Sequence, residues 1–146
     1  MIDERFYRAD PDDIGVKGLV FIGEKLLIYR RDNNAPKYPM MLDVPGGGKE
    51  GNETPFETFK RELKEEFGLD IILENIIYAR RYASIYDIGK FGWYTVARLT
   101  AEQEGKIEFG NEGTEFMLME PSEYLSQTDV WPVYQQRARD YFTSLT

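Results

Sequence analysis

Short apolar runs alternate with turn-forming residues along the first third of the chain. Residues 15–22 and 25–29 form two such runs separated by a Gly-Glu pair, a pattern that predicts a β-hairpin with a tight turn. Residues 31–41 are rich in Asp, Asn and Pro and predict a loop. Residues 42–44 then predict a short return to extended chain before a run of glycines.

Residues 54–68 carry both start and stop signals for one helix. Thr54 can cap the helix and Glu57 completes a capping box, while Gly68 supplies a left-handed stop. At 100° per residue one face of this helix is apolar, which predicts that it packs on a sheet. That apolar stripe comprises Phe56, Phe59, Leu63 and Phe67.

The second half of the chain reads as further β-structure followed by a helix. Residues 71–86 and 91–99 are rich in β-branched and aromatic residues and predict a second hairpin. Residues 115–120 predict a short strand, and residues 128–145 carry aromatics at near-helical spacing after a Ser or Thr cap. Together the elements predict one α/β domain with a mixed sheet, spanning residues 1–146.

Composition narrows the chemistry that this domain can perform. The 146 residues, 42% apolar and 30% charged, suit one globular domain of common size, and they include no cysteine and no histidine. Thiolate nucleophiles, disulfides, zinc sites built from Cys or His, and any imidazole base are therefore excluded. The remaining means of catalysis are carboxylates, hydroxyls, Lys, Arg and a hard metal ion.

The charge balance argues against polyanionic partners. With 26 acidic and 18 basic residues the net charge is -8, which opposes stable binding to nucleic acid or to an anionic membrane. The first residues lack a basic segment followed by an apolar one, and no apolar run approaches the length needed to span a bilayer. We therefore expect a soluble, cytoplasmic protein.

Three glutamates stand on one side of the predicted helix. Glu62 and Glu66 are one turn apart, and Glu65 lies a turn from Glu62, so the three carboxylates are expected to converge. Such a cluster is either a solvated acidic face or a site for a cation that offsets the repulsion. Carboxylate oxygens are the ligands that Mg²⁺ and Mn²⁺ prefer.

The residues around the glutamates complete a longer pattern. From Gly47 to Leu69 the chain reads G-x5-E-x7-R-E-U-x-E-E-x-G-U, where U is apolar, and this resembles the Nudix box. A chance match in a chain of this length has a probability on the order of one in ten million, from average residue frequencies. The Pro-Gly-Gly-Gly sequence before the box and the predicted strands around it also resemble the family.

The resemblance implies a fold and a reaction. The fold would be the Nudix-type α/β/α sandwich. The reaction would be metal-dependent hydrolysis of the diphosphate linkage in a nucleoside diphosphate joined to another group X, such as a nucleoside triphosphate, dinucleoside polyphosphate, nucleotide sugar or ADP-ribose. The partner implied is therefore a small-molecule nucleotide.

The resemblance also implies roles for the residues of the box. Glu62 and Glu66 match the principal metal ligands, with Glu65 a ligand or a base for the attacking water and the Gly47 carbonyl a further ligand. The implied cofactor is Mg²⁺ or Mn²⁺.

Two more box residues, and residues outside the helix, complete the predicted catalytic set. Glu53 and Arg61 match the pair that braces the loop against the helix, and a charge-assisted contact between them is physically reasonable. Because the chain has no histidine, the proton acceptor must be a carboxylate. Glu65 is one candidate, and a loop glutamate, Glu112 or else Glu115, is the other.

Substrate identity is less constrained. Arg30 and Arg31 end a predicted strand and either contact phosphates or are solvated strand-end charges. Tyr86 lies 17 residues past Leu69, a spacing that resembles the tyrosine of diadenosine polyphosphate hydrolases. The proline that ADP-ribose pyrophosphatases carry near this point is absent. Neighbouring aromatics could stack a base or fill the sheet core.

Three classes of function are compatible with the sequence. The first is a Nudix pyrophosphohydrolase, the second a non-catalytic Nudix-like domain that senses a nucleotide, and the third an acidic interaction domain. The complete set of box glutamates favours the enzyme. The oligomeric state stays open, with a homodimer among the options.

Overall fold

A mixed β-sheet forms the centre of the molecule. In the computed structural model, which describes residues 1–111 and 113–146, seven strands join this sheet in the order β3-β2-β1-β6-β5, with β4 paired to β1 and β7 paired to β2. The pairing of β1 with β6 is parallel, and the other pairings are antiparallel. The strands are β1 (Asp13–Ile22), β2 (Lys25–Arg31), β3 (Leu42–Asp43), β4 (Gly46–Gly48), β5 (Ile76–Ala83), β6 (Phe91–Leu99) and β7 (Gly113–Met119).

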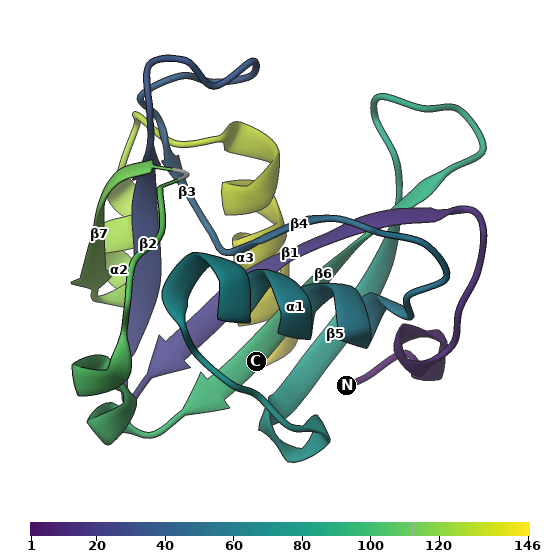
Figure 1. Ribbon diagram of the computed structural model, residues 1–146, viewed down its shortest axis with the longest axis horizontal. Helices are drawn as coiled ribbons and strands as arrows, with labels where there is room; N and C mark the ends of the chain where they lie inside the picture. The colour runs from purple at the N-terminus through teal and green to yellow at the C-terminus, as the bar shows by residue number, and fades with distance from the viewer. Residues whose placement is uncertain (112) are drawn as a thin grey trace.

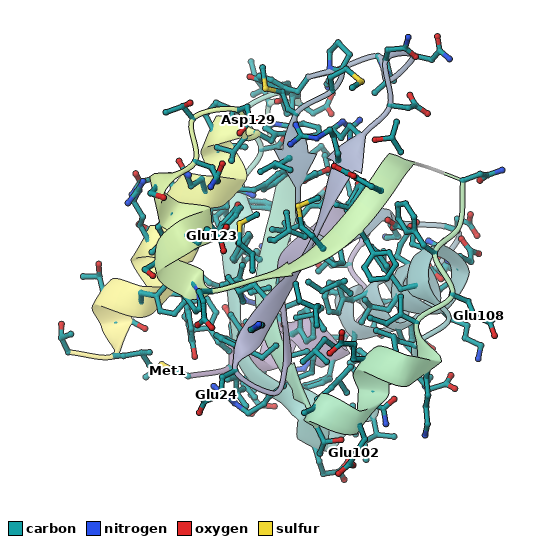
Figure 2. The ribbon with its side chains drawn as sticks, turned by 90° about the vertical axis from the view of Figure 1, so that its left-hand side faces the viewer. Met1, Glu24, Glu102, Glu108, Glu123 and Asp129 are labelled. Atoms are coloured by element: carbon teal, nitrogen blue, oxygen red, sulfur yellow. The ribbon has the colours of Figure 1, made fainter. Side chains whose placement is uncertain are left out.

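Helices cover both faces of the sheet. Figure 1 shows α1 in front of the sheet and α3 behind it, and the view turned by 90° in Figure 2 places α1 and the helices α2 and α3 on opposite sides. The predicted α/β/α sandwich is therefore confirmed. The α-helices are α1 (Pro55–Phe67), α2 (Pro121–Ser126) and α3 (Pro132–Ser144), and short 3₁₀ turns are η1 (Glu4–Tyr7), η2 (Leu73–Asn75) and η3 (Ala101–Lys106).

Strand alternation divides the interior into two apolar layers. Val16 and Val20 of β1 lie in the layer on the α1 side, and Leu19 and Phe21 lie in the layer on the α3 side. The same alternation holds in β2 and β6 because successive side chains of a strand point to opposite faces. The sheet is thus buried on both faces, which explains its nearly continuous apolar strands.

Helix α1 forms as its sequence predicts. The Thr54 hydroxyl accepts a hydrogen bond from the Glu57 amide (3.1 Å), and the Glu57 carboxylate accepts one from the Thr54 amide (2.8 Å). Gly68 ends the helix at φ 67°, in the left-handed region. The apolar stripe includes Phe59, Leu63 and Phe67, each fully buried, and each contributing roughly 1.5–3 kcal/mol through its burial.

The first hairpin opens into two separate halves of the sheet. β1 and β2 pair only next to their turn, at Phe21 with Leu26 and Ile22 with Lys25. Further along, β1 pairs with β4, while β2 pairs with β3 and β7. The divergence of β1 from β2 leaves room between the halves, and the cleft described below lies there.

The predicted strand over residues 71–86 is wrong at both ends. The Asn75 carboxamide oxygen accepts a hydrogen bond from the Ile72 amide (2.7 Å), which favours the turn η2 before β5 begins at Ile76. At the other end the Ser84 hydroxyl accepts hydrogen bonds from the amides of Tyr86 and Asp87 (both 3.1 Å), which folds residues 84–87 into a turn. The rest of the second hairpin is confirmed, since β5 pairs with β6.

The C-terminal helix also begins later than predicted. Leu42 donates a hydrogen bond to the Asp129 carbonyl (2.7 Å) and accepts one from the Trp131 amide (3.0 Å), so residues 129–131 are held as extended chain beside β3. Trp131 is the N-cap of α3 and makes no side-chain capping hydrogen bond, so the expected Ser or Thr cap is wrong. Helix α2 was not predicted. Among the described residues, no helix is long and apolar enough to cross a membrane.

Candidate active site

A cleft of about 400 Å³ lies where β1 and β2 diverge. Its walls come from β1, β2, β4 and β6, from α1 and α3, and from the turn at residues 84–86. It therefore borders the glycine-rich strand β4, the predicted metal-binding helix and the C-terminal helix at once. Two residues of the box, Gly47 and Glu62, are among the residues that line the cleft.

Arg61 joins the loop before α1 to the helix itself. Its Nε donates to Glu53 Oε2 (2.7 Å) and its Nη2 donates to Glu53 Oε1 (3.1 Å) and to the Gly48 carbonyl (2.8 Å). Glu53 Oε1 also accepts hydrogen bonds from the Thr58 hydroxyl (3.0 Å) and the Glu50 amide (2.8 Å). The predicted ion pair of Glu53 with Arg61 is thus confirmed, and it ties β4 and its following loop to α1.

The electrostatics of this pair favour its charged form. The hydrogen bonds from Arg61 hold the pKa of the Glu53 carboxyl below its ordinary value, against a smaller opposing effect of burial. The same bonds raise the pKa of the Arg61 guanidinium, so both groups stay ionised near neutral pH. Both side chains are 19% exposed, and so the pair is partly protected from solvent screening.

The three glutamates of α1 differ in environment. Glu66 is 2% exposed and Glu62 8%, whereas the Glu65 side chain is more than half exposed. Arg61 Nη1 donates to Glu62 Oε1 (3.0 Å) and to Glu65 Oε2 (3.2 Å). One guanidinium nitrogen therefore binds both carboxylates. Within the described part of the chain, no group of three or more acidic side chains is close enough to hold an ion. At these side-chain positions the three carboxylates do not form such a group, and their convergence on an ion stays a prediction.

Gly47 and Glu62 nevertheless form a close contact at the cleft. A Cβ added to Gly47 would lie 2.6 Å from the Oε1 and Cδ of Glu62, so only glycine leaves this carboxylate in place. A Cβ added to Gly15 on β1 would in turn lie 2.8 Å from the Gly47 carbonyl oxygen. The carboxylate oxygens of Glu62 and Glu66 and the carbonyl oxygen of Gly47 are hard donors. This set of oxygens fits Mg²⁺ or Mn²⁺.

A buried charge cluster contributes Lys17, Tyr29 and Arg31 to the lining of the cleft. The fully buried Asp43 Oδ2 accepts hydrogen bonds from Lys17 Nζ (2.8 Å), Arg31 Nη1 (2.8 Å) and the Tyr29 hydroxyl (3.0 Å). Burial by itself would lower the pKa of Lys17, and it is the largest single effect, but the attraction of Asp43, Tyr29 and Glu66 together with the hydrogen bond to Asp43 outweighs it, so the pKa is raised. The cluster therefore keeps two cations against one carboxylate, and its net charge is positive.

The neighbouring residues Arg30 and Arg31 have different surroundings in the structure. Arg31 lines the cleft, and its guanidinium lies 4.6 Å from the Trp131 ring centroid. Arg30 donates instead to Asp129 Oδ2 and to the Met40 carbonyl (both 2.9 Å), and it is not among the described residues that line the cleft. Tyr86 lines the rim, 47% exposed, with Lys37 Nζ 3.6 Å from its ring centroid.

The loop carboxylates complete the set of predicted residues. Glu115 lies on β7 opposite Arg30, with its side chain 60% exposed and 3.6 Å from Arg30 Nε. Glu112 lies outside the residues that the structure describes. Residues 108–110 run along the end of α1, because the Glu108 and Gly110 amides donate to the carbonyls of Phe67 (2.9 Å) and Glu66 (2.8 Å), and Figure 2 shows Glu108 on the α1 side.

Sequence reasoning missed part of the cleft. Lys17 and Asp43 sit in apolar or short segments where their pairing could not be read, since they are 26 positions apart. Trp131, Tyr134 and Arg137 reach the cleft from the start of α3 and the residue before it. The near-helical spacing of Trp131 and Tyr134 was visible, but only the packing of α3 on the sheet brings them to the site.

A family model supports the interpretation that fold and site suggest. The NUDIX domain model matches residues 13–141, and the chain belongs to this family. It is a Nudix hydrolase, an enzyme that acts on phosphoanhydride bonds. No curated protein matches the sequence.

Solved structures share the fold at low sequence identity. A MutT protein from Methanosarcina mazei Go1 is similar at a TM-score of 0.71 and 19% identity, over 91% of this chain and 94% of that chain. A C. elegans Ap4A hydrolase in a binary complex is similar at 0.66 and 16%, over 90% and 97%. A NUDIX hydrolase from Nitrosomonas europaea is similar at 0.69 and 22%, over 92% and 72%.

Proposed function

We propose that the protein is a metal-dependent pyrophosphohydrolase that cleaves the diphosphate linkage of a nucleoside diphosphate joined to another group X. The observation that carries this proposal is the contact between Glu62 and Gly47. It sets a buried carboxylate against a side-chain-free backbone in a cleft whose lining also includes the cations Lys17 and Arg31. An acidic face exposed only to solvent would need neither feature.

Glu62 and Glu66 would hold the ion, with Glu65 and the Gly47 carbonyl as further ligands. A divalent cation at these oxygens supplies Lewis-acid polarisation of the phosphates and activation of the attacking water. The role of Arg61 and Glu53 is to position: they fix β4 to α1, so that the carboxylates keep one geometry relative to the cleft. Mg²⁺ and Mn²⁺ both suit this set of oxygens.

The proton acceptor is a carboxylate, and two residues are proposed. Glu65 is exposed at the same turn of α1 as the metal-binding residues. Glu112 would instead enter from the segment before β7. If Glu112 is the base, Glu112→Gln should lower turnover and leave the metal affinity unchanged. If Glu65 is the base, Glu65→Gln should lower turnover and Glu112→Gln should not. Loss of turnover in Glu115→Gln alone would reassign the role to Glu115.

The substrate would lie between the glutamates of α1 and the aromatic wall of α3. Arg31 provides a guanidinium at the cleft, which suits phosphate oxygens, and Tyr86 offers a ring at the rim. Arg30 is paired with Asp129, and its side chain would have to move away from this partner to contact a phosphate. One similar structure is an Ap4A hydrolase, which supports dinucleoside polyphosphates as one substrate class to test. Nucleic acid is not expected to bind stably, given the net charge of -8.

A product-release screen tests the proposal. Nucleoside triphosphates, nucleotide sugars, ADP-ribose and dinucleoside polyphosphates are each incubated with the protein and Mg²⁺ or Mn²⁺. We expect cleavage of at least one class, and Glu62→Gln and Glu66→Gln should each reduce its turnover on the order of 10²-fold or more.

Glu123→Gln, on α2 across the sheet from α1, is the matched control and should retain turnover (Figure 2). Near wild-type turnover in both helix variants at saturating Mg²⁺ would show that the metal assignment is wrong. Nucleotide binding without cleavage of any class would favour a nucleotide sensor instead.

A further inference from the structure

Arg137 is a buried cation in the cleft that the site described above does not use. The residue is 7% exposed and lines the cleft from α3. Among the described residues its guanidinium makes no hydrogen bond and no ion pair. A buried guanidinium without a counter-charge is costly, so a specific reason for its presence is required.

Aromatic rings enclose this guanidinium without neutralising it. Its central carbon lies 4.3 Å from the Tyr82 ring centroid and 5.6 Å from that of Tyr134. Asp140, one turn further along α3, is bound instead by the Tyr82 hydroxyl (2.8 Å) and lies 3.9 Å from Arg80. Burial lowers the pKa of Arg137, as expected where ring faces replace water and no carboxylate is in contact.

Gly92, which lines the cleft beside Arg137, places no side chain next to the guanidinium. A Cβ added to Gly92 would meet only Arg137 Nη1, at 3.8 Å, which is ordinary van der Waals contact. Neither packing nor a positive φ requires glycine at this position. The absence of a side chain there leaves open the space next to the unpaired guanidinium, which is a second indication of a ligand group.

The position of Arg137 identifies which part of a substrate it could meet. Gly92 on β6 pairs with Gly15 on β1, and the next residue of β1, Val16, pairs with Gly47 on β4. Two strand spacings therefore separate Gly92 from Gly47, roughly 10 Å. This is longer than a diphosphate, so a diphosphate placed at Glu62 leaves Arg137 for a more distant group.

We propose that Arg137 is a specificity-determining residue that binds an anionic group, a phosphate or a carboxylate, on the part of the substrate remote from the cleaved diphosphate. This inference rests on the proposed function, because it takes the diphosphate to lie beside Glu62. The favoured substrates are nucleoside diphosphate derivatives that carry a further negative charge. A charge-assisted hydrogen bond in a buried site then discriminates between otherwise identical ligands.

Matched ligand pairs test this preference. UDP-glucuronate and UDP-glucose differ by a carboxylate on the X group, and coenzyme A and dephospho-coenzyme A differ by a phosphate on the nucleoside. Affinities are measured by calorimetry with divalent ions chelated, so that turnover does not consume the ligand. We expect the protein to bind the more charged member of one pair about tenfold more tightly or better. The pair that shows the preference reveals which end carries the anion.

Variants assign the preference to Arg137. Arg137→Met should reduce it to within about twofold while leaving the affinity for the less charged member nearly unchanged, and Arg137→Lys should restore part of it. Arg80→Met is the matched control, because Arg80 also lies over the Tyr82 ring (4.6 Å) but does not line the cleft, and it should retain the preference. If Arg137→Met fails to fold, Gly92→Ala provides a second test, since its methyl group narrows the cleft next to Nη1 and should weaken binding of the charged member.

Equal affinity for both members of both pairs, or no binding of any of the four, would overturn the inference. A preference that survives Arg137→Met would overturn it as well. These outcomes are separate from failure of the proposed function, which would appear as no cleavage of any nucleotide with Mg²⁺ or Mn²⁺ while the binding preference persisted.

Discussion

The carboxylate of Glu62 occupies the space into which a side chain on Gly47 would project, 2.6 Å from the position of an added Cβ. Gly47→Ala should therefore displace this carboxylate and leave the fold intact, because the end of a glutamate side chain can rotate away. A displacement of about 1 Å of a metal-binding group should lower turnover on the order of 10²-fold.

Steady-state rates on the best substrate from the nucleotide screen measure this effect. Gly48→Ala is the neighbouring comparison, since its Cβ would meet only the Ile14 carbonyl, at 3.9 Å. A much smaller loss is expected there. Equal losses in both variants would assign the effect to the loop as a whole and not to Glu62.

Removal of the Glu53 charge should change the pH dependence of stability. The pKa of Glu53 is lowered in the folded state by Arg61, so the unfolded chain takes up this proton at higher pH than the folded chain. The stabilisation is complete above the ordinary glutamate pKa and is lost as pH falls through the lowered folded-state pKa. Glu53→Gln should thus be less stable than the parent at pH 7, and the difference should shrink in acid.

Chemical denaturation at a series of pH values from 7 to 3 checks this expectation. Glu74→Gln, an exposed substitution in η2, serves as the charge-matched control. A difference between Glu53→Gln and the parent that stays constant over this range would show that the ion pair does not contribute to stability through ionisation.

Asp43 is expected to be the most sensitive acidic residue outside α1. Its fully buried carboxylate holds Lys17, Arg31 and Tyr29, and Asp43→Asn would leave the two cations without their counter-charge. A loss of about 3–5 kcal/mol in unfolding free energy is expected from breaking a buried ion pair on one side. Urea denaturation measures it.

Asp70→Asn removes an exposed partner of Lys64 (3.2 Å) and should cost less than about 1 kcal/mol. Comparable losses at Asp43 and Asp70 would contradict the importance of burial at the first site.

Metal removal should abolish activity without unfolding the protein. The apolar layers on both faces of the sheet supply most of the folding free energy, and they do not depend on an ion. EDTA is thus expected to remove turnover and leave the circular dichroism spectrum unchanged, with recovery on addition of excess Mg²⁺ or Mn²⁺.

The unfolding temperature gives a readout that does not need substrate. Added Mg²⁺ should raise it in the parent, because a ligand that binds the folded state stabilises it, and should do so much less in Glu62→Gln. A rise of equal size in both proteins would indicate that the ion binds elsewhere.

Local sequence determined the helix that carries the glutamates. The capping box of Thr54 with Glu57, the apolar stripe and the Gly68 stop act within a few residues of one another, so their effect can be read without the rest of the chain. The same holds for the pair of Glu53 and Arg61. Glu53 directly precedes the helix cap and Arg61 lies eight residues later on the helix, so local structure brings the two side chains together. Strand alternation likewise determined which of the two apolar layers each strand side chain enters.

The tertiary structure decided how distant segments share those elements. Arg30 and Arg31 are neighbours in sequence, but pairing of β2 with β3 and β7 directs one to Asp129 and the other into the cleft. Arg137 reaches the cleft only because α3 packs behind β6. Such contacts depend on chain segments tens of residues apart, whose mutual placement is determined by the packing of the whole core and not by local propensity.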